Sequence, residues 1–405
     1  MLNWTNQFNI FCFLDNRQYN IAPHEYECLL GAGASHFVRS DDLQSLDAFL
    51  KRHSGWKFGH LSYDLKDSIY FSSNKKDQIG FPRLYFFVPQ FVLFIRDGEL
   101  NILAKNSEAI YEAILNQQII HAAQGYNLQI QQRLTQQQYI EKIKLLQKHI
   151  LRGDCYEINF CQEFFCEEAE VDPAIIFQRL MEVSPNPFSA LYRIDDKFLI
   201  CASPERFLQK SASKIICQPM KGTAKRDLLN SEDDENLKLE LKQSKKDQSE
   251  NVMVVDLVRN DLTKICKDGS VKVDELFGIY SYPQVHQMIS TISGELKNEM
   301  SFSKILEATF PMGSMTGAPK YRVMELIDEH EEESRGIFSG SVGYISPEND
   351  FDFNVVIRSM MYNATKKYLS YKVGSGITFY SDPEKEWEEC LLKGEAIKKV
   401  LDSLG

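Results

Sequence analysis

Two pairs of acidic residues have the spacing that places both carboxylates of a pair on one face of a helix. Asp247 and Glu250 form the first pair, and Glu386 and Glu389 form the second. Like charges at this spacing repel unless a cation lies between them. Two such faces brought together would offer four oxygen ligands, the donor type that Mg²⁺ prefers. A solvated helix face is the alternative for each pair, although Trp387 and an apolar run after Glu250 indicate buried surface nearby.

Lys221 and Glu205 are candidates for covalent and acid catalysis. Lys221 lies in the sequence QPMKGT (218–223), directly after an apolar strand-like segment. A lysine beside buried surface can have a lowered pKa, and the uncharged amine is the nucleophilic form. Glu205, in the sequence SPERF (203–207), is a candidate general acid. An ordinary surface lysine is the alternative for Lys221.

Glycine-containing loops occur three times in the C-terminal half, at 312–320, 340–344 and 374–377. The first precedes an expected helix, whose first N–H groups could bind an anion. The other two lie beside strands, where glycine lets a ligand approach the backbone. None has the pattern of a Walker A loop or a dinucleotide fingerprint, so nucleotide binding is not indicated. Tight turns are the alternative.

Two cationic residues accompany these loops. Arg358 ends an apolar strand-like run that begins at residue 353, and a guanidinium there must find an anion, from a neighbour or a ligand. Lys393 follows Glu389 by four residues, so it is either the salt-bridge partner of Glu389 or a substrate contact.

Periodicity and end signals predict the elements that would position these residues. Strand-like segments lie at 81–95, 100–103, 156–165 and 188–201, and helices are expected at 302–310, 319–331 and 384–404. Thr135 and Gln138 form a possible capping box for a further helix that Gly153 would end. A charged, helix-favouring run covers 226–249, a linker is expected at 122–132, and 274–282 is expected to be a loop.

Strands and helices alternate irregularly, without a repeat. This pattern predicts an α+β fold, and we place a boundary between an N-terminal region at 1–130 and a larger domain at 131–405.

Composition restricts the classes of function. The chain has 405 residues, 43% of them hydrophobic and 25% charged, as is typical of globular proteins. Its net charge of -11 argues against a nucleic-acid partner, because phosphate binding needs clustered Lys and Arg. The nine cysteines include no Cys-x-x-Cys pair, which favours reduced thiols in the cytoplasm. No signal peptide and no apolar run of roughly 20 residues is found, so no membrane partner is expected.

The chorismate-utilising enzymes resemble this chain in several segments that occur in the same order. This family comprises component I of anthranilate and aminodeoxychorismate synthases, isochorismate synthases and salicylate synthases. The resemblance is strong over 136–404 and weaker around 55–65. The matching segments are 153–159, 203–207, 250–261, 313–320, 357–358 and 374–393.

The resemblance implies a fold and a set of site residues. The fold is that of anthranilate synthase component I, with large, mostly antiparallel sheets flanked by helices and two lobes around one cleft. Glu250 and Glu389 match the principal Mg²⁺ ligands, with Asp247 and Glu386 as their partners, and Glu205 matches the acid that helps the C4 hydroxyl leave. Positions that match substrate-binding residues are Thr316, Tyr344, Arg358, Gly374, Gly376 and Lys393.

Two positions distinguish the branches of the family. Enzymes that attack chorismate with water carry a lysine where this chain has Glu157, and ammonia users usually have glutamine there. Anthranilate synthases resemble Pro-Ile-Ala-Gly-Thr at the Lys221 segment, whereas aminodeoxychorismate synthases resemble Pro-Ile-Lys-Gly-Thr. The Lys221 segment of this chain is therefore similar to that of the second branch. The active-site histidine of the family falls on Gln287, and no role is assigned to the adjacent His286.

The resemblance thus implies component I of an aminodeoxychorismate synthase. Such an enzyme makes 4-amino-4-deoxychorismate for folate biosynthesis from chorismate and ammonia, here through a covalent bond to uncharged Lys221. Ammonia would come from a separate glutamine amidotransferase subunit, because no Gly-x-Cys-x-Gly nucleophile turn is present. The alternatives are component I of anthranilate synthase and a non-catalytic protein that binds an amidotransferase or a regulatory ligand.

Overall fold

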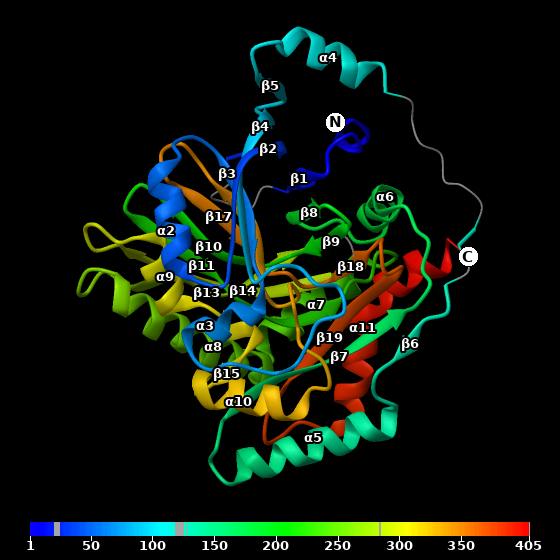
Figure 1. Cartoon of the computed structure of the whole chain (residues 1–405). Coiled ribbons are helices and arrows are strands. Elements are labelled where there is room, and N and C mark those ends of the chain that lie inside the picture. The colour runs from blue at the N-terminus through cyan, green and yellow to red at the C-terminus, as the bar shows by residue number, and fades with distance from the viewer. Residues whose placement is uncertain (20–24, 118–124, 127, 283–284, 405) are drawn as a thin grey trace.

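The computed structural model describes residues 1–19, 25–117, 125–126, 128–282 and 285–404. Within these residues the fold is α+β, as expected, and all strand pairs are antiparallel (Figure 1). The strands are β1 (Ile10–Asp15), β2 (Cys28–Ser40), β3 (Lys57–Leu61), β4 (Leu84–Arg96), β5 (Glu99–Leu103), β6 (Gln131–Gln132), β7 (Glu157–Cys166), β8 (Phe188–Ile194), β9 (Lys197–Ser203), β10 (Arg206–Ser211), β11 (Lys214–Gln218), β12 (Met220–Lys225), β13 (Lys272–Ser281), β14 (Val285–Glu295), β15 (Gly317–Ala318), β16 (Ser341–Ile345), β17 (Phe351–Asn354), β18 (Ser359–Asn363) and β19 (Tyr368–Ile377).

The strand pairings form two arms that meet at the N-terminal strands. One arm runs β2, β1, β8, β9, β18, β19 and β7. The other runs β3, β16, β17, β10, β11 and β14, with β12 and β13 also paired to β14. The long strand β4 joins them, because it pairs with β2 as well as with β3 and β5.

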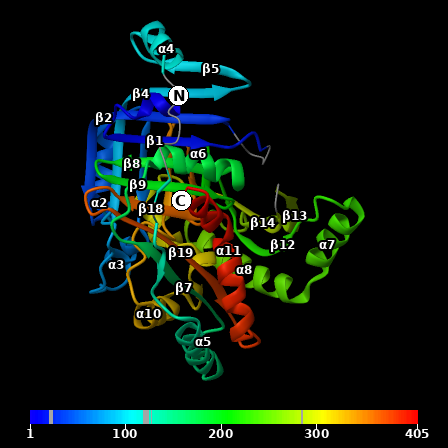
Figure 2. The same ribbon diagram turned by 90° about the vertical axis from the view of Figure 1, so that its right-hand side faces the viewer.

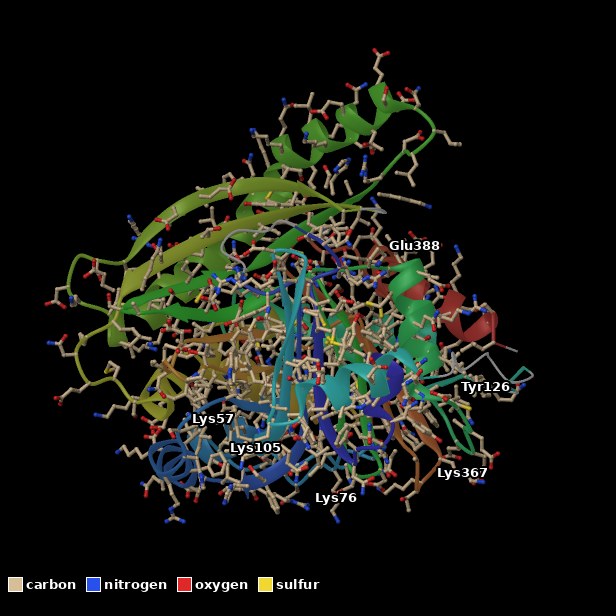
Figure 3. The ribbon with its side chains drawn as sticks, turned by 90° about the horizontal axis from the view of Figure 1, so that it is seen from above. Lys57, Lys76, Lys105, Tyr126, Lys367 and Glu388 are labelled. Atoms are coloured by element: carbon tan, nitrogen blue, oxygen red, sulfur yellow. The ribbon has the colours of Figure 1, made fainter. Side chains whose placement is uncertain are left out.

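Helices cover the outside of this sheet system. They are α1 (Leu2–Thr5), α2 (Leu43–Arg52), α3 (Lys66–Ile69), α4 (Ser107–Leu115), α5 (Gln136–Leu151), α6 (Pro173–Val183), α7 (Ser231–Gln243), α8 (Lys245–Ile265), α9 (Phe302–Thr309), α10 (Lys320–His330) and α11 (Pro383–Asp402), with short 3-10 turns at Tyr63–Leu65 and Gly313–Met315. The expected helices at 302–310, 319–331 and 384–404 are thus present. Helix α7 projects from the body in Figure 2 and lies at the top of Figure 3.

Capping explains where two of the helices begin. The expected capping box is formed, since Thr135 accepts a hydrogen bond from the Gln138 N–H and the Gln138 side chain binds back to Thr135. The charged run at 226–249 is broken into α7 and α8, because Ser244 ends the first helix and caps the second. The Asp247 N–H donates to the Ser244 hydroxyl, so the cap also fixes the first turn of α8.

Two sequence expectations are corrected. Residues 274–282 are not a loop, because most of them belong to β13, which pairs with β14 through several register shifts. Asp274, Glu275 and Gly278 are residue types that are depleted in strands, which explains why the sequence reads as a loop. The strand-like segment 188–201 is two strands, separated by a turn in which Asp195 has a φ of 53°. The expected linker lies partly outside the described residues.

The proposed boundary at residue 130 separates segments that pair directly with each other. Strand β1 pairs with β8, and β3 pairs with β16. Both large apolar clusters combine side chains from the two segments, such as Phe86 with Phe353 and Phe13 with Phe177. The division stays a prediction about sequence organisation.

Among the described helices, none is long and apolar enough to cross a bilayer.

Candidate active site

Five elements that contact one another carry the carboxylate pairs, Lys221, Gly376 and Glu157. The two carboxylate pairs lie in the first two turns of α8 and of α11. Helix α8 packs on β12, which carries Lys221, and α11 packs on β19, which carries Gly376. Strand β19 pairs with β7, whose first residue is Glu157. Elements far apart in sequence therefore bring acidic, basic and glycine residues together.

Lys221 and Glu157 form a buried ion pair at the centre of this group. The Lys221 Nζ donates a hydrogen bond to the Glu157 Oε1, and the two side chains are only 11% and 3% exposed. Gly376 lies against the pair, because a Cβ at this position would stand 2.7 Å from both the Glu157 Oε1 and the Lys221 Nζ. The absence of a side chain at 376 therefore provides the space that the pair occupies.

The charge state of Lys221 differs from the sequence expectation of an uncharged amine. Burial alone would lower the pKa of Lys221, but Glu157, Glu250 and Glu389 outweigh burial and raise it. The ammonium form is therefore the resting form of Lys221 in this arrangement. The correction has a physical reason: three carboxylates surround the lysine, and none of them is adjacent to it in sequence.

The helix carboxylates share a cation that sequence reasoning missed. The Lys246 Nζ lies 3.9 Å from the Glu250 Oε1 and 3.7 Å from the Glu386 Oε1, between the two helix faces. Burial opposes the charged form of Lys246, yet Glu250, Glu386 and Glu389 raise its pKa. Lys246 precedes Glu250 by four residues, a spacing that could have indicated the contact.

The other two carboxylates are engaged within their own helices. The Ser244 hydroxyl donates to the Asp247 carboxylate, which makes Asp247 part of the helix cap. Lys393 lies 2.8 Å from the Glu389 Oε1 and also donates to the Gly374 carbonyl at 3.1 Å. Lys393 lowers the pKa of Glu389 in opposition to burial. Lys393 is thus the salt-bridge partner of Glu389 in this structure.

Glu250 and Glu386 each have a carboxylate oxygen that a divalent metal ion could take. Within the described residues, the Glu250 Oε1 and the Glu386 Oε2 are buried oxygens without a hydrogen-bond partner. Burial raises the pKa of Glu250 to about 7, as expected for a carboxylate whose charge is not fully compensated. A buried oxygen without a donor is costly, and a cation is a suitable partner. Lys246 already places one positive charge beside both side chains.

Glu205 has the environment of a carboxylic acid that keeps its proton. It lies between β9 and β10 and is 3% exposed. Burial raises its pKa to about 7, against the opposing effects of the Ser314 hydroxyl and the Lys221 charge. A small pocket is lined by Glu205, Ser314 and Asp261 among others. A carboxyl group with this pKa can donate a proton at neutral pH.

Arg358 is a guanidinium available for an anion. It stands between β17 and β18 with a φ of 50°, the left-handed region that non-glycine residues rarely adopt. Among the described residues its side chain makes no hydrogen bond or ion pair, while Tyr282 and Glu205 lie near enough to act on its charge. A cation in this position is suited to a carboxylate ligand.

Three of the residues expected to contact substrate make contacts within the chain. The Thr316 hydroxyl donates to the Met312 carbonyl at 3.1 Å, inside its own loop. A Cβ at Gly374 would stand 2.1 Å from the Phe160 carbonyl oxygen, so this glycine permits close pairing of β19 with β7. Tyr344 packs against Tyr26 and Trp56 of the N-terminal segment. Their contact with substrate stays a prediction.

Arg335 and Glu331 are buried, lie outside the expected set and connect elements of the site. The Arg335 guanidinium forms a bidentate pair with Glu331 and donates to the Met315 and Asn159 carbonyls. It thereby links the Thr316 loop to β7. Nothing in the spacing of Arg335 distinguishes it from a surface residue.

His286, to which no role was assigned, binds Ser281 and Asp234, on the side of α7.

Comparisons with known proteins identify relatives of this chain. The profile of a family described as chorismate binding enzyme matches residues 10–399. "Aminodeoxychorismate synthase component 1" of Escherichia coli K12 is 38% identical over 272 residues, which cover 67% of this chain and 59% of that protein. An "Anthranilate synthase component I-like protein" of Synechocystis is 31% identical over 369 residues, 89% of this chain and 75% of that protein.

Solved structures share the fold. Anthranilate synthase component I of Streptococcus pneumoniae superposes with a TM-score of 0.80 at 22% identity, over 95% of this chain and 93% of that one. This likeness confirms the expected fold class. The match to the Escherichia coli protein spans little more than half of that protein's length.

Proposed function

Because the chain belongs to the family of chorismate-binding enzymes, we propose that it aminates chorismate to 4-amino-4-deoxychorismate. The observation that carries this proposal is Lys221, buried in the middle of the carboxylate group and in direct contact with Glu157. The similarity to aminodeoxychorismate synthase component 1 supports the same reading. Water as the nucleophile is disfavoured, because Glu157 stands where the water-using relatives have a lysine.

The residues around Lys221 have complementary roles in this reaction. Arg358 and Lys393 hold the carboxylates of chorismate, and Mg²⁺ bound by Glu250, Glu386 and Glu389 would supply a Lewis acid for one of them. Lys221 bonds to C2 as the C4–O bond breaks, and the hydroxyl leaves as water with the proton of Glu205. Ammonia then bonds to C4 while the bond between C2 and Lys221 breaks, which restores the amine.

Glu157 has a specific role in this sequence. Lys221 rests as an ammonium ion, so its proton must leave before the amine can attack. The Glu157 Oε1 already accepts a hydrogen bond from the Lys221 Nζ, and it is the proton acceptor in direct contact with that atom. Glu157 therefore replaces the usual glutamine with a group that both holds and deprotonates the lysine.

The remaining parts of the proposal concern cofactor, partner and location. The cofactor is Mg²⁺, supported by the buried oxygens of Glu250 and Glu386 that have no hydrogen-bond donor among the described residues. The ammonia source is a separate glutamine amidotransferase subunit. A cytoplasmic location is supported by nine buried cysteines that are all free thiols.

Product analysis tests the proposal. Full-length protein is supplied with chorismate, MgCl₂ and an ammonium salt, with and without an aminodeoxychorismate lyase. We expect mass spectrometry to find aminodeoxychorismate without the lyase and 4-aminobenzoate with it. Fluorescent anthranilate without any lyase would identify an anthranilate synthase instead, and no turnover of chorismate would leave only a binding role.

Lys221→Ala tests the covalent step in the same assay. The variant should fold normally, because the lysine is replaced by a smaller side chain beside Gly376. We expect it to lose aminodeoxychorismate formation and to change which atom ammonia reaches. Formation of aminodeoxychorismate at the wild-type rate would show that Lys221 is not the nucleophile. Lys225→Ala, on the same strand and exposed, is the matched control.

A further inference from the structure

A second group of metal-ligating side chains lies away from the Lys221 site, where α5 and α10 end. Both views show these helices side by side at the bottom of the molecule (Figures 1 and 2). His149 stands near the end of α5, and His330 is the last residue of α10, preceded by Glu329. One ligand atom from each of the three residues lies within 4.8 Å of the others.

The two imidazole rings face each other through nitrogen atoms. The His149 Nε2 lies 3.3 Å from the His330 Nε2, and the Glu329 Oε1 lies 3.8 Å from the same His330 nitrogen. Two nitrogens bound to one tetrahedral Zn²⁺ lie about 3.3 Å apart, because each Zn–N bond is about 2.0–2.1 Å. The separation in the structure therefore equals the one that shared coordination requires.

The hydrogen bonds of His149 orient its free nitrogen toward this point. The His149 Nδ1 lies 2.7 Å from the Asp154 Oδ2 and 2.8 Å from the Arg152 Nη2. An ionised carboxylate only accepts hydrogen bonds. In the tautomer whose Nδ1–H donates to Asp154, the Nε2 presents its lone pair to His330. A carboxylate behind a histidine ligand is the usual arrangement in zinc sites. Arg152 donates to the same Asp154 oxygen at 2.9 Å and keeps that carboxylate in place.

We propose that His149, Glu329 and His330 form a Zn²⁺ site that joins the ends of α5 and α10. The two histidine side chains are 14% and 11% exposed, whereas Glu329 is 59% exposed and leaves the site open to solvent. Three protein ligands and one water complete a tetrahedral shell. Imidazole suits Zn²⁺ and not Mg²⁺, so this site is chemically separate from the carboxylate group around Lys221.

The position of the site indicates a structural role. Helix α5 leads into β7, which begins at Glu157, and α10 follows the loop that carries Thr316. Between them, Gly317 and Ala318 of β15 pair with Ile158 and Glu157 of β7. A metal that joins the two helices therefore braces the segments that enter and leave this pairing. The inference does not depend on which reaction the enzyme catalyses.

Zinc binding by the full chain tests the proposal. Protein treated with a chelator and dialysed is titrated with ZnCl₂ in competition with a chromophoric chelator. We expect one tight Zn²⁺ per chain, a higher Tm on its addition, and no such effect of MgCl₂. With CoCl₂ in place of zinc, the visible absorption of tetrahedral Co²⁺ should appear.

Variants separate this site from chance binding. His330→Gln and the exposed Glu329→Gln should each lose the tight site, and Asp154→Asn should weaken it by about 10–100-fold. His53→Gln is the matched control, because its ring centroid lies 4.5 Å from that of His36 without a third ligand among the described residues. If His330→Gln does not fold, zinc binding by Glu329→Gln tests the proposal instead.

Two results would overturn the proposal. One is an absence of tight zinc binding by the wild-type chain. The other is zinc binding that Glu329→Gln and His149→Gln leave unchanged. In either case the two rings are joined only by a hydrogen bond between their Nε2 atoms.

Discussion

Glu157 and Lys221 make contact across 64 positions of sequence, and each changes what the other can do. Replacing Glu157 by Gln removes one negative charge but keeps an oxygen near the Lys221 Nζ. The pKa of Lys221, which Glu157 raises, should then fall. A larger fraction of Lys221 is then uncharged at a given pH, so the residue should react faster with an amine-specific reagent, as mass spectrometry of the modified lysine measures. Glu157→Asp keeps the charge and should keep the wild-type rate; an unchanged rate in Glu157→Gln would exclude this coupling.

Glu205 should control the loss of activity at higher pH. Its pKa of about 7 means that the acid form is lost as the pH rises through 7, so wild-type activity should fall there. Glu205→Gln should lose about 10²–10⁴-fold in kcat at pH 6 and no longer show this loss at higher pH. Glu235→Gln, on the exposed surface of α7, is the control. A falling limb that persists in Glu205→Gln would assign the acid to another residue.

The same shift has a consequence for the stability of the fold. The pKa of Glu205 is higher in the folded state than the ordinary 4.5, so the stability it contributes is present below pH 4.5 and lost as the pH rises through 7. Glu205→Gln should therefore be more stable than the wild type at pH 8, by roughly 3 kcal/mol, and similar at pH 4. Urea unfolding at the two pH values measures this difference.

Lys246 competes with any cation for the two helix carboxylates. Lys246→Met removes a charge about 4 Å from Glu250 and Glu386, so Mg²⁺ should bind about fivefold more tightly, equivalent to ~1 kcal/mol in a largely aqueous setting. Calorimetric titration with MgCl₂ measures the change. The exposed neighbour Lys245→Met should leave the affinity as it is. Weaker Mg²⁺ binding in Lys246→Met would mean that the lysine helps to arrange the ligands.

At the scale of the elements, two glycines of β19 have different functions two positions apart. Ala at 374 would meet the Phe160 carbonyl, part of the backbone, whereas Ala at 376 would meet only the ends of the Glu157 and Lys221 side chains. Gly374→Ala should lower Tm strongly, because β19 must move away from β7. Gly376→Ala should keep Tm within a few degrees and lose most activity. Equal losses of Tm would contradict this division of roles.

Some features of these elements could be predicted from the sequence alone, and others could not. The i, i+3 spacing of the carboxylates predicts their shared helix faces, and Thr135 with Gln138 predicts the start of α5. Local sequence patterns cannot predict the contact of Lys221 with Glu157, because that contact depends on how β7, β19 and β12 are arranged in space. The same limit applies to Tyr344, whose surroundings come from the N-terminal segment.

At the scale of the whole molecule, residues 1–130 are required by the rest. Without them, β8 and β16 lose the strands that pair with one edge of each, and both apolar clusters lose part of their side chains. A fragment of residues 131–405 should therefore be aggregated or unfolded, as gel filtration and circular dichroism would show. Adding separately produced residues 1–130 during refolding should recover soluble protein. A monomeric, cooperatively unfolding 131–405 fragment would contradict this.

In the newly made protein, the pairing of β3 with β16 is delayed until β16 has been synthesised. β3 ends at residue 61, and its partner begins at residue 341. At typical rates of translation the ribosome needs roughly 15 to 60 s to make the chain between them. During that interval one edge of a strand that is buried in the folded protein has no partner in its own chain, so the nascent polypeptide is a client for chaperones that cover strand edges. Limited proteolysis of arrested chains can follow when that edge becomes protected.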